Sequence, residues 1–356
     1  MKKTISVLLS VLMLVLCFAP SASAISIEEG TPMLDLQFKN DKASNGIDYV
    51  YFSPVKSEDP VKYPLFIWLH AENSAKYKRS QLQPYKLSNW ASDEYQARFQ
   101  NAGGCFILAP RANLTAANSW DSTQVFFLKD VIDEFIRKNE THIDTDRIYI
   151  AGCSTGGEMV WNMLDTFSDF FAAGIPVCAS SQPASTTLSK LKYTSVWIFS
   201  CDKDPSPLAK TESAFTTFAS LGNMTKRPSG VRITTMSEAV FADYSKKTEW
   251  KNGQAKLSDD AEHCIWEAVT YDMHMADGSL YAYSNTLDSK GKAVDFSDSS
   301  GVISWLSAQK KVAQVEDEEP GEDASGDFWS MVNSIMNVII TRIATVIEQL
   351  LGIKII

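Results

Sequence analysis

The sequence predicts an open, mostly parallel β-sheet that is doubly wound, with helices packed on both of its faces. Two observations support this α/β fold class. Short β-prone runs alternate with stretches of helical period over about 250 residues, which is the pattern of repeated β-α-β units. Several of the runs are apolar without interruption, as in strands that are buried on both faces of a sheet.

The predicted elements follow one another from residue 33 to residue 311. Alternating or continuous apolar character predicts strands over residues 33–39, 47–55, 63–70, 105–110, 147–151, 172–178, 195–200 and 231–236. Apolar positions at a period of 3.6 residues predict helices over residues 89–99, 126–138, 156–167, 210–221 and 302–311. Two polar stretches, 245–260 and 276–300, are interpreted as loops or insertions.

Both ends of the chain lie outside the predicted fold. Residues 1–24 combine two lysines, an apolar run and an A-S-A sequence at the end, the pattern of a secretory signal peptide that is cleaved after Ala24. We therefore expect a secreted protein whose folded domain covers residues 25–313. Residues 314–326 form an acidic linker without core-forming side chains.

The C-terminal segment, residues 327–356, is predicted to hold an amphipathic helix between Phe328 and Leu351. Polar side chains repeat along one stripe, and apolar side chains fill most of the rest. The polar stripe and Arg342 near the centre argue against a transmembrane span, and a lysine-rich face for anionic membranes is missing. Docking on the domain, self-association, attachment to a membrane surface and a span all stay open.

Charge and cysteine content limit the classes of function. The formal net charge is −10, which argues against a nucleic-acid-binding protein. The four histidines are scattered and no C-x-x-C pair occurs, so neither a structural metal nor a cofactor is expected. Export permits disulfides, and the five cysteines that follow the signal peptide leave at least one thiol without a partner in the chain.

A candidate nucleophile lies between a predicted strand and a predicted helix. Residues 152–156 read G-C-S-T-G, a match to the G-x-S-x-G pattern of a nucleophile elbow. In such an elbow the serine occupies a strained turn, and glycine is needed on both sides because a larger neighbour would clash. Ser154 is therefore the predicted nucleophile.

A serine nucleophile needs a base and an acid, which in this fold class follow the serine in the order acid, then histidine. His142 precedes the strand that delivers Ser154, so it belongs to the opposite edge of the sheet. His70 precedes the serine in the loop expected to help bind the oxyanion. His263 and His274 remain, and His263 is favoured because Cys264 and Trp266 flank it in a loop.

The acid is expected at the end of the next-but-one strand after Ser154. That strand is predicted over residues 195–200, and the sequence C-D-K-D-P follows it at residues 201–205. Asp204 is favoured over Asp202 because Pro205 fits a sharp turn that would aim the carboxylate inward.

The motifs as a set resemble a known group of proteins. They read YPLFIWLH at 63–70, WAS at 90–92, LAP at 108–110, SW at 119–120, DRIYIAGCSTGG at 146–157, VWIF at 196–199 and DP at 204–205. They look like the secreted α/β-hydrolase esterases related to polyhydroxybutyrate depolymerases and feruloyl esterases, often described as predicted peptidases of the prolyl oligopeptidase type. The resemblance covers roughly residues 35–311 and implies the α/β-hydrolase fold.

The resemblance also implies site residues. The triad of the family falls on Ser154, Asp204 and His263, and its oxyanion donors on the backbone N–H groups of Thr155 and Glu72. The family usually has H-G-G-G-E where this chain has H-A-E-N at residues 70–73, and H-G where this chain has S-C at residues 200–201. The first departure lies in the loop that would carry the donor at Glu72.

The local sequence around the serine also resembles that of tannases and some feruloyl esterases. In those proteins the G-C-S-T-G-G and H-C motifs are bridged, which implies a disulfide between Cys153 and Cys264 here. Cys178 and Cys201 end predicted strands that are neighbours, so a second bridge is an open alternative.

These observations together predict a secreted serine esterase that acts through an acyl-enzyme. The resemblance favours a plant-polysaccharide ester with a feruloyl or acetyl group, and Trp120 and Trp266 are candidate substrate-binding residues. A serine peptidase with the same mechanism is the nearest alternative. A non-catalytic binding module that keeps the fold is an alternative from another class.

Overall fold

The structure is a computed structural model. It describes residues 36–55, 61–72, 82, 87–100, 102–112, 119–191, 194–201, 204–220, 231–236, 266–272, 286–288, 292–294 and 301–311. The predicted signal peptide, acidic linker and C-terminal helix, and the predicted loop at 245–260, lie outside these residues. No helix within the described ranges combines the length and apolar character that a membrane span requires.

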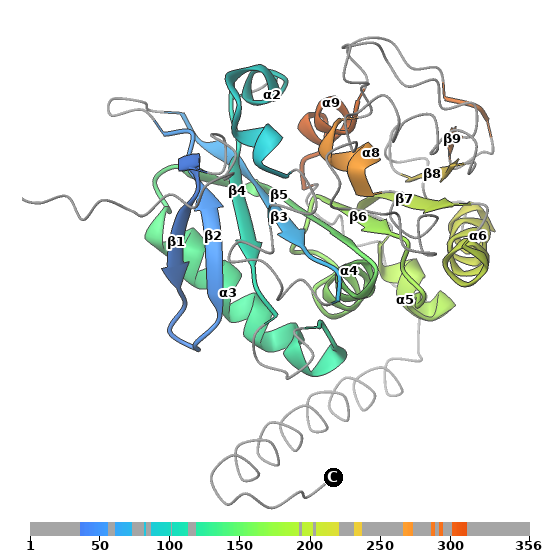
Figure 1. Cartoon of the computed structure of the whole chain (residues 1–356). Helices are drawn as coiled ribbons and strands as arrows, with labels where there is room; N and C mark the ends of the chain where they lie inside the picture. The colour runs from blue at the N-terminus through green and yellow to red at the C-terminus, as the bar shows by residue number, and fades with distance from the viewer. Residues whose placement is uncertain are drawn as a thin grey trace, which may run out of the picture.

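Nine strands of the described residues form one sheet, in the order β1-β2-β4-β3-β5-β6-β7-β8-β9 (Figure 1). All neighbours from β4 to β8 are parallel, and antiparallel pairs occur only towards the two edges. The strands are β1 (Lys39–Lys42), β2 (Asp48–Phe52), β3 (Tyr63–Leu69), β4 (Phe106–Pro110), β5 (Ile143–Cys153), β6 (Ala173–Val177), β7 (Ser195–Cys201), β8 (Val231–Met236) and β9 (Thr286–Asp288). The predicted open, mostly parallel sheet is confirmed.

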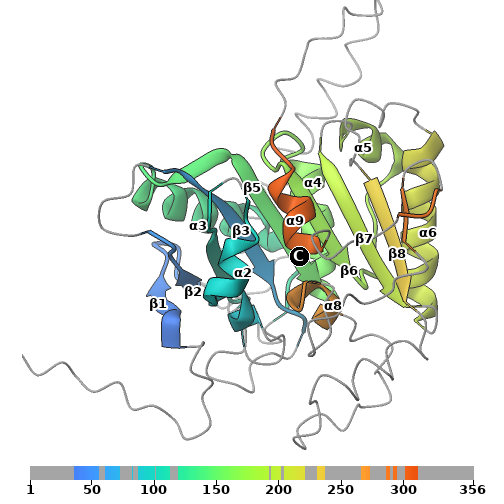
Figure 2. The same ribbon diagram turned by 90° about the horizontal axis from the view of Figure 1, so that it is seen from above.

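Helices cover both faces of this sheet (Figures 1 and 2). One face carries α3 (Val125–Lys138), which the short helix η5 (Ser122–Gln124) precedes, with α4 (Thr155–Thr166), α5 (Ser185–Lys190) and α6 (Pro205–Ser220). The other face carries η4 (Leu87–Ala91), α2 (Asp93–Ala97), α8 (Trp266–Thr270) and α9 (Val302–Ser307). The central strands therefore have an apolar core on each side.

The double core explains the continuous apolar runs of the sequence. Every residue of β3 is buried, and its side chains alternate between the faces because the side-chain period of a strand is two. Phe66 and Trp68 join the core under α2 and α9, whereas Leu65 and Ile67 join the core under α3 and α4.

The first predicted strand, residues 33–39, is wrong where the structure describes it. Residues 36 and 37 lie in a helical turn, and the strand is β1, whose four residues are all exposed. An edge strand is held by backbone hydrogen bonds to its single neighbour, here β2, so it needs no apolar face. The residues of β1 are therefore all polar, and the sequence shows no alternation of polar and apolar residues there.

Other differences also have local causes. Pro205, interpreted as a turn residue, is instead the first residue of α6, where its fixed φ and missing N–H suit a helix start. The short elements α5 and β9 were not predicted, and β9 lies inside the polar stretch 276–300 that was interpreted as loop. Both are short and rich in polar side chains, so periodicity is too weak to mark them.

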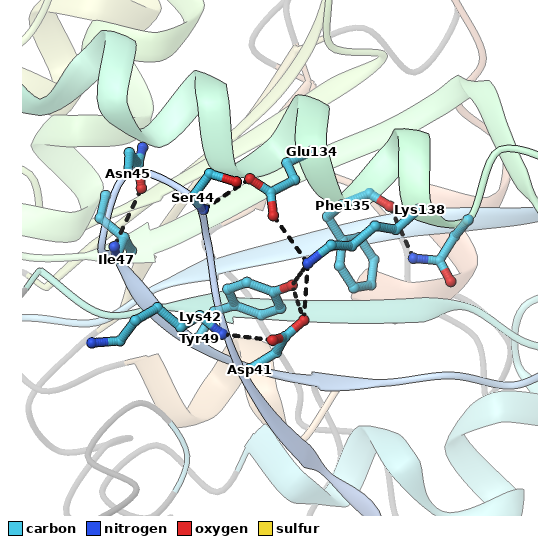
Figure 3. Close-up of polar contacts among 10 residues, drawn as sticks. Asp41, Lys42, Ser44, Asn45, Ile47, Tyr49, Glu134, Phe135 and Lys138 are labelled. Atoms are coloured by element: carbon cyan, nitrogen blue, oxygen red, sulfur yellow. Dashed lines mark hydrogen bonds and ion pairs between the residues drawn. The ribbon is translucent and has the colours of Figure 1, made fainter.

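A polar cluster fastens the β1–β2 hairpin to α3 (Figure 3). The Tyr49 hydroxyl donates to Asp41 Oδ2 over 2.6 Å. Lys138 Nζ lies 3.1 Å from Asp41 Oδ2 and 2.9 Å from Glu134 Oε1. The Ser44 N–H donates to Glu134 Oε2 over 2.9 Å. This backbone hydrogen bond, and then the Lys138 ammonium, lower the pKa of Glu134 to about 2.

We expect Glu134→Gln to lower the free energy of unfolding at pH 7 by about 1 kcal/mol, because a charge-assisted contact at a partly exposed site is lost. The folded-state pKa of Glu134 lies below its usual 4.5. The stabilisation is therefore present above pH 4.5 and is lost as the pH falls towards 2. Urea unfolding between pH 7 and pH 3 checks this.

The matched control is Asp133→Asn, one residue earlier on the same helix. The Asp133 carboxylate is 49% exposed and forms an ion pair with Lys129 on the same helix, so its loss is expected to change stability by less than about 0.5 kcal/mol. Equal losses in the two variants, or the same pH dependence in Glu134→Gln and wild type, would contradict the prediction.

Candidate active site

Ser154 lies in the turn between β5 and α4, at the carboxyl end of a central strand. Its backbone has φ 54° and ψ −123°, a conformation that costs a non-glycine residue about 1–3 kcal/mol. The turn is held by two backbone bonds of 2.9 Å, from the Ser154 N–H to the Val177 oxygen and from the Glu158 N–H to the Ser154 oxygen. A strained serine between a strand and a helix is the geometry that presents a nucleophile at the edge of a sheet.

The two glycines of the motif let this turn close. A Cβ atom on Gly152 would lie 2.6 Å from the Gly156 oxygen, and a Cβ atom on Gly156 would lie 2.6 Å from the His70 oxygen and also collide with the Leu69 oxygen. These are backbone atoms with fixed neighbours, so larger side chains have no room. The elbow therefore packs directly against the end of β3 and the loop that follows it.

His70 stands at the start of that loop and is fully buried. Its Nε2 accepts the Ala112 N–H over 2.9 Å, so the proton is on Nδ1, which donates to the Ala71 oxygen over 2.7 Å. Burial lowers the pKa of His70 to about 4, and the Arg111 guanidinium acts in the same direction. His70 is thus a neutral imidazole that joins the loop after β3 to the residues that follow β4.

The strand order, the elbow and a sequence match decide the fold family. Residues 124–229, which include the elbow, match the prolyl oligopeptidase family. The chain has the α/β-hydrolase fold. A poly(3-hydroxybutyrate) depolymerase from Ralstonia pickettii is 32% identical over 112 residues, which are 28% of this chain and 21% of the depolymerase. The relation to such depolymerases and to the prolyl oligopeptidase type, which the motifs predict, is confirmed by these two matches.

Solved structures with a similar chain path include esterases. A thermostable esterase has a TM-score of 0.48 at 26% identity, over 66% of this chain and 59% of its own. A feruloyl esterase module from Clostridium thermocellum has a TM-score of 0.45 at 14% identity, over 67% of this chain and 88% of its own. The chain thus matches about a fifth of the length of the depolymerase and 59% of the length of the thermostable esterase.

In this α/β-hydrolase fold, Asp204 follows the strand at whose end the sequence predicts the acid of a triad. It follows β7, and β7 is separated from β5 by β6 alone, so the next-but-one strand is as predicted. Its N–H donates to the Cys201 oxygen over 3.2 Å, and its carbonyl oxygen accepts the Leu208 N–H over 2.9 Å. Asp204 is half-buried at the start of α6.

The predicted base and its alternatives are not all described. His263, Cys264, His274 and Asp202 lie outside the described residues. His142 is described and lies before β5, where its carbonyl oxygen accepts the Tyr63 N–H at the first residue of β3. This is the edge of the sheet opposite to Ser154, as predicted.

The two predicted oxyanion donors occupy different elements. Thr155 is the first residue of α4, and the N–H groups of a first helical turn have no partner inside the helix. Glu72 is exposed and follows Ala71 in the loop after β3. The elbow and this loop touch at Gly156, so both donors belong to one packed unit.

The predicted aromatic residues are almost fully buried. Trp120 is 3% exposed, and its ring centroid lies 5.5 Å from that of His70. Trp266 is 9% exposed and is the first residue of α8. Packing therefore accounts for most of the surface of both side chains, and only an edge is left for a substrate.

Three buried cysteines follow one another at the carboxyl ends of adjacent strands. Cys153 ends β5, Cys178 follows β6 and Cys201 ends β7, all in the core under α8 and α9. That Cys178 and Cys201 come from neighbouring strands is as predicted. Between the cysteines that the structure describes, no disulfide is formed. Over the same ranges, no three His, Cys, Asp or Glu side chains gather as a metal site.

Two charged residues that the sequence did not single out hold α8 in place. Asp272 has φ 54° and a carboxylate that is 2% exposed. Its Oδ2 accepts from Arg98 Nη1 over 2.6 Å, and its Oδ1 accepts the Ile303 N–H at the start of α9 over 2.7 Å. The Trp90 indole N–H donates to the Thr270 oxygen over 2.9 Å. These pairs are far apart in the chain, so no local pattern marked them.

We expect the acid sensitivity of the fold to depend on His70. Its folded-state pKa of about 4 lies below the usual 6.5, so the unfolded chain binds this proton first as the pH falls. The free energy of unfolding is therefore expected to fall by about 3 kcal/mol as the pH is lowered from 6.5 to 4, with no further loss from this group at lower pH. Chemical denaturation of wild type and His70→Gln at pH 7, 5.5 and 4 measures this, and parallel pH curves would contradict it.

Proposed function

We propose that the protein is a secreted serine hydrolase that cleaves carboxylic esters. The observation that carries the proposal is the strained Ser154 between β5 and α4, with no room for any side chain at Gly152 or Gly156. A strained backbone that the surrounding structure enforces is found where a side chain must be presented for chemistry.

In this proposal Ser154 attacks the ester carbonyl and its proton passes to His263. A tetrahedral intermediate forms, and its oxyanion accepts hydrogen bonds from the N–H groups of Thr155 and Glu72. The intermediate collapses, the C–O bond to the alcohol breaks and the alcohol takes the proton from His263. A water molecule then repeats these steps on the acyl-enzyme and frees the acid and Ser154.

Asp204 is proposed to orient His263 and to stabilise its charged form. Its position after β7, two strands from Ser154 in the same sheet, supports the assignment. Asp202 stays the alternative acid and His274 the alternative base. The start of α4 at Thr155 supports the oxyanion site, because the N-terminus of a helix carries partial positive charge.

We also propose a disulfide between Cys153 and Cys264. It would tie the residue before the nucleophile to the residue after the base and so limit changes in their separation. Peptide mapping of the unreduced protein is expected to recover both cysteines in one linked pair. Recovery of both as alkylated thiols would exclude the bridge.

The substrate class is proposed from the relatives. Feruloyl or acetyl esters of plant polysaccharide fit an exported enzyme of this group, and edges of Trp120 and Trp266 are the proposed contacts for the acyl or sugar part. The match of residues 124–229 to the prolyl oligopeptidase family supports a second candidate, a serine peptidase with the same mechanism.

Active-site labelling tests the proposal on the wild-type protein. A fluorophosphonate is expected to add to the tryptic peptide that contains Ser154 and to abolish hydrolysis of short-chain, acetyl or feruloyl esters in proportion to labelling. Turnover of peptide substrates in place of esters would favour the peptidase. Absence of labelling together with absence of turnover would leave a non-catalytic binding module as the better interpretation.

Secretion and the role of the tail are tested on the full-length protein. The exported form is expected to begin at Ile25 by N-terminal sequencing. Flotation with liposomes, compared with a version that ends at Gly321, separates attachment to a membrane surface from docking or self-association. A shift in flotation on removal of the tail supports attachment, and equal behaviour argues against it.

A further inference from the structure

We propose that His70 is the positioning residue of the oxyanion hole and acts through the peptide bond between Ala71 and Glu72. The inference rests on the proposed function, in which the Glu72 N–H is one of the two oxyanion donors. It assigns to the His70 side chain a role in the orientation of that donor and no role in proton transfer.

The peptide unit supplies the link. The carbonyl of Ala71 and the N–H of Glu72 belong to one planar trans group and point in opposite directions. The Nδ1–H of His70 holds the Ala71 oxygen over 2.7 Å. Because the ring is fully buried whereas Glu72 is exposed, the carbonyl points into the protein and the N–H points to the outer side of the loop.

The other ring nitrogen of His70, Nε2, is also held by a hydrogen bond. Nε2 accepts the Ala112 N–H over 2.9 Å, so the ring spans from the β3 loop to the residues after β4. The Trp120 ring packs near it, with centroids 5.5 Å apart. Rotation of the imidazole would leave buried polar groups without partners, at about 1–3 kcal/mol each, so the ring has one stable orientation.

The same segment is packed on the nucleophile turn. Leu69 pairs with Gly152 across β3 and β5, and the oxygen of His70 lies where any Cβ atom on Gly156 would have to fit. The peptide bond between Ala71 and Glu72 therefore directly follows the His70 carbonyl group, which packs against the elbow that presents Ser154.

The chemistry of the ring fits a fixed role. A catalytic acid or base needs a pKa near the working pH and access to the reacting atoms. His70 has neither, since both nitrogens are occupied by backbone groups and burial lowers its pKa to about 4. A neutral imidazole with a hydrogen bond at each ring nitrogen can, however, fix the orientation of a peptide plane.

Two amide substitutions separate the two nitrogens. The Asn side chain places its amide near the position of Nδ1 and keeps a donor for the Ala71 oxygen, whereas the Gln side chain reaches the position of Nε2. We expect His70→Asn to keep kcat within about 10-fold of wild type, and His70→Gln to lower kcat about 100-fold, as for loss of one oxyanion donor. KM is expected to change by less than about 3-fold in both.

A trifluoromethyl ketone reads the oxyanion hole directly, because its adduct with Ser154 carries an oxyanion. Its inhibition constant is expected to rise about 100-fold in His70→Gln. The dissociation constant of the matching secondary alcohol, which forms no adduct, is expected to stay unchanged. His142→Gln, a histidine at the opposite edge of the sheet, is the matched control and should leave both constants as in wild type.

The outcomes are separable. Equal ketone inhibition by His70→Gln and wild type would overturn the inference, and so would parallel losses for ketone and alcohol, which would indicate a general loss of structure. If His70→Gln does not fold, His70→Asn decides, and a 100-fold loss of ketone affinity in that variant would overturn the inference. Failure of the ketone to form an adduct with wild type would instead remove the proposed function itself.

Discussion

Ser154→Ala is expected to lower kcat/KM for the best ester substrate by at least about 10⁴-fold, because removal of a triad nucleophile leaves only binding and oxyanion stabilisation. The fold should be kept. Alanine has the same backbone requirements as serine at φ 54°, and the two hydrogen bonds of the turn come from backbone groups. Steady-state kinetics and thermal unfolding of the purified mature protein measure the two effects.

The control for Ser154→Ala is Ser200→Ala on β7. Ser200 is fully buried, and among the residues that the structure describes its hydroxyl has no hydrogen-bond partner, so its removal is expected to leave kcat/KM within about 2-fold of wild type. Equal turnover by Ser154→Ala and wild type would take away the assignment of the nucleophile.

Gly156→Ala is expected to cost about 3 kcal/mol of stability or more, together with most of the activity. The new Cβ atom would lie 2.6 Å from the His70 oxygen and 2.7 Å from the Leu69 carbonyl carbon. Both are backbone atoms at the end of a central strand, so relief requires a shift of the elbow or of the oxyanion loop. Thermal unfolding measures the loss of stability, and the rate of fluorophosphonate labelling measures the loss of site geometry.

Gly174→Ala on β6 provides the matched comparison. Its Cβ atom would lie 2.7 Å from Leu164 Cδ1, the far end of a side chain that can change rotamer. We expect a loss of about 1 kcal/mol and normal labelling of Ser154. A Gly156→Ala protein that is as stable and as reactive as Gly174→Ala would show that the tight approach at the elbow is not required.

Some polar contacts could not be predicted from local sequence pattern because they join residues that are far apart in the chain. Asp272 and Arg98 are 174 residues apart and form an ion pair in which the carboxylate is buried and the guanidinium is partly exposed. The Ser44 N–H meets Glu134 from 90 residues away. Their partners are set by how α2, α3, α8 and the β1–β2 hairpin pack, and residue type alone does not specify which charges come together.

The sequence by itself determined the alternation of strands and helices, the doubly covered sheet and the position of Ser154 at the end of β5. These features are local: side-chain period fixes which residues face a core, and a strained turn needs glycine at defined positions. Chain order also placed Asp204 after the strand that is β7, although Pro205 begins a helix there.

Three features could be found only in the tertiary structure. They are the exposed edge strand β1, the contacts of Asp272 that hold α8 in place, and the protonation state and hydrogen bonds of His70. A buried histidine looks the same in sequence whether it is a base, a ligand or a structural group. Its neutral form, its tautomer and its hold on the Ala71 oxygen follow from the Ala112 N–H, which arrives from 42 residues away. Packing brings that donor to the ring, and the ring then fixes the peptide beside the nucleophile.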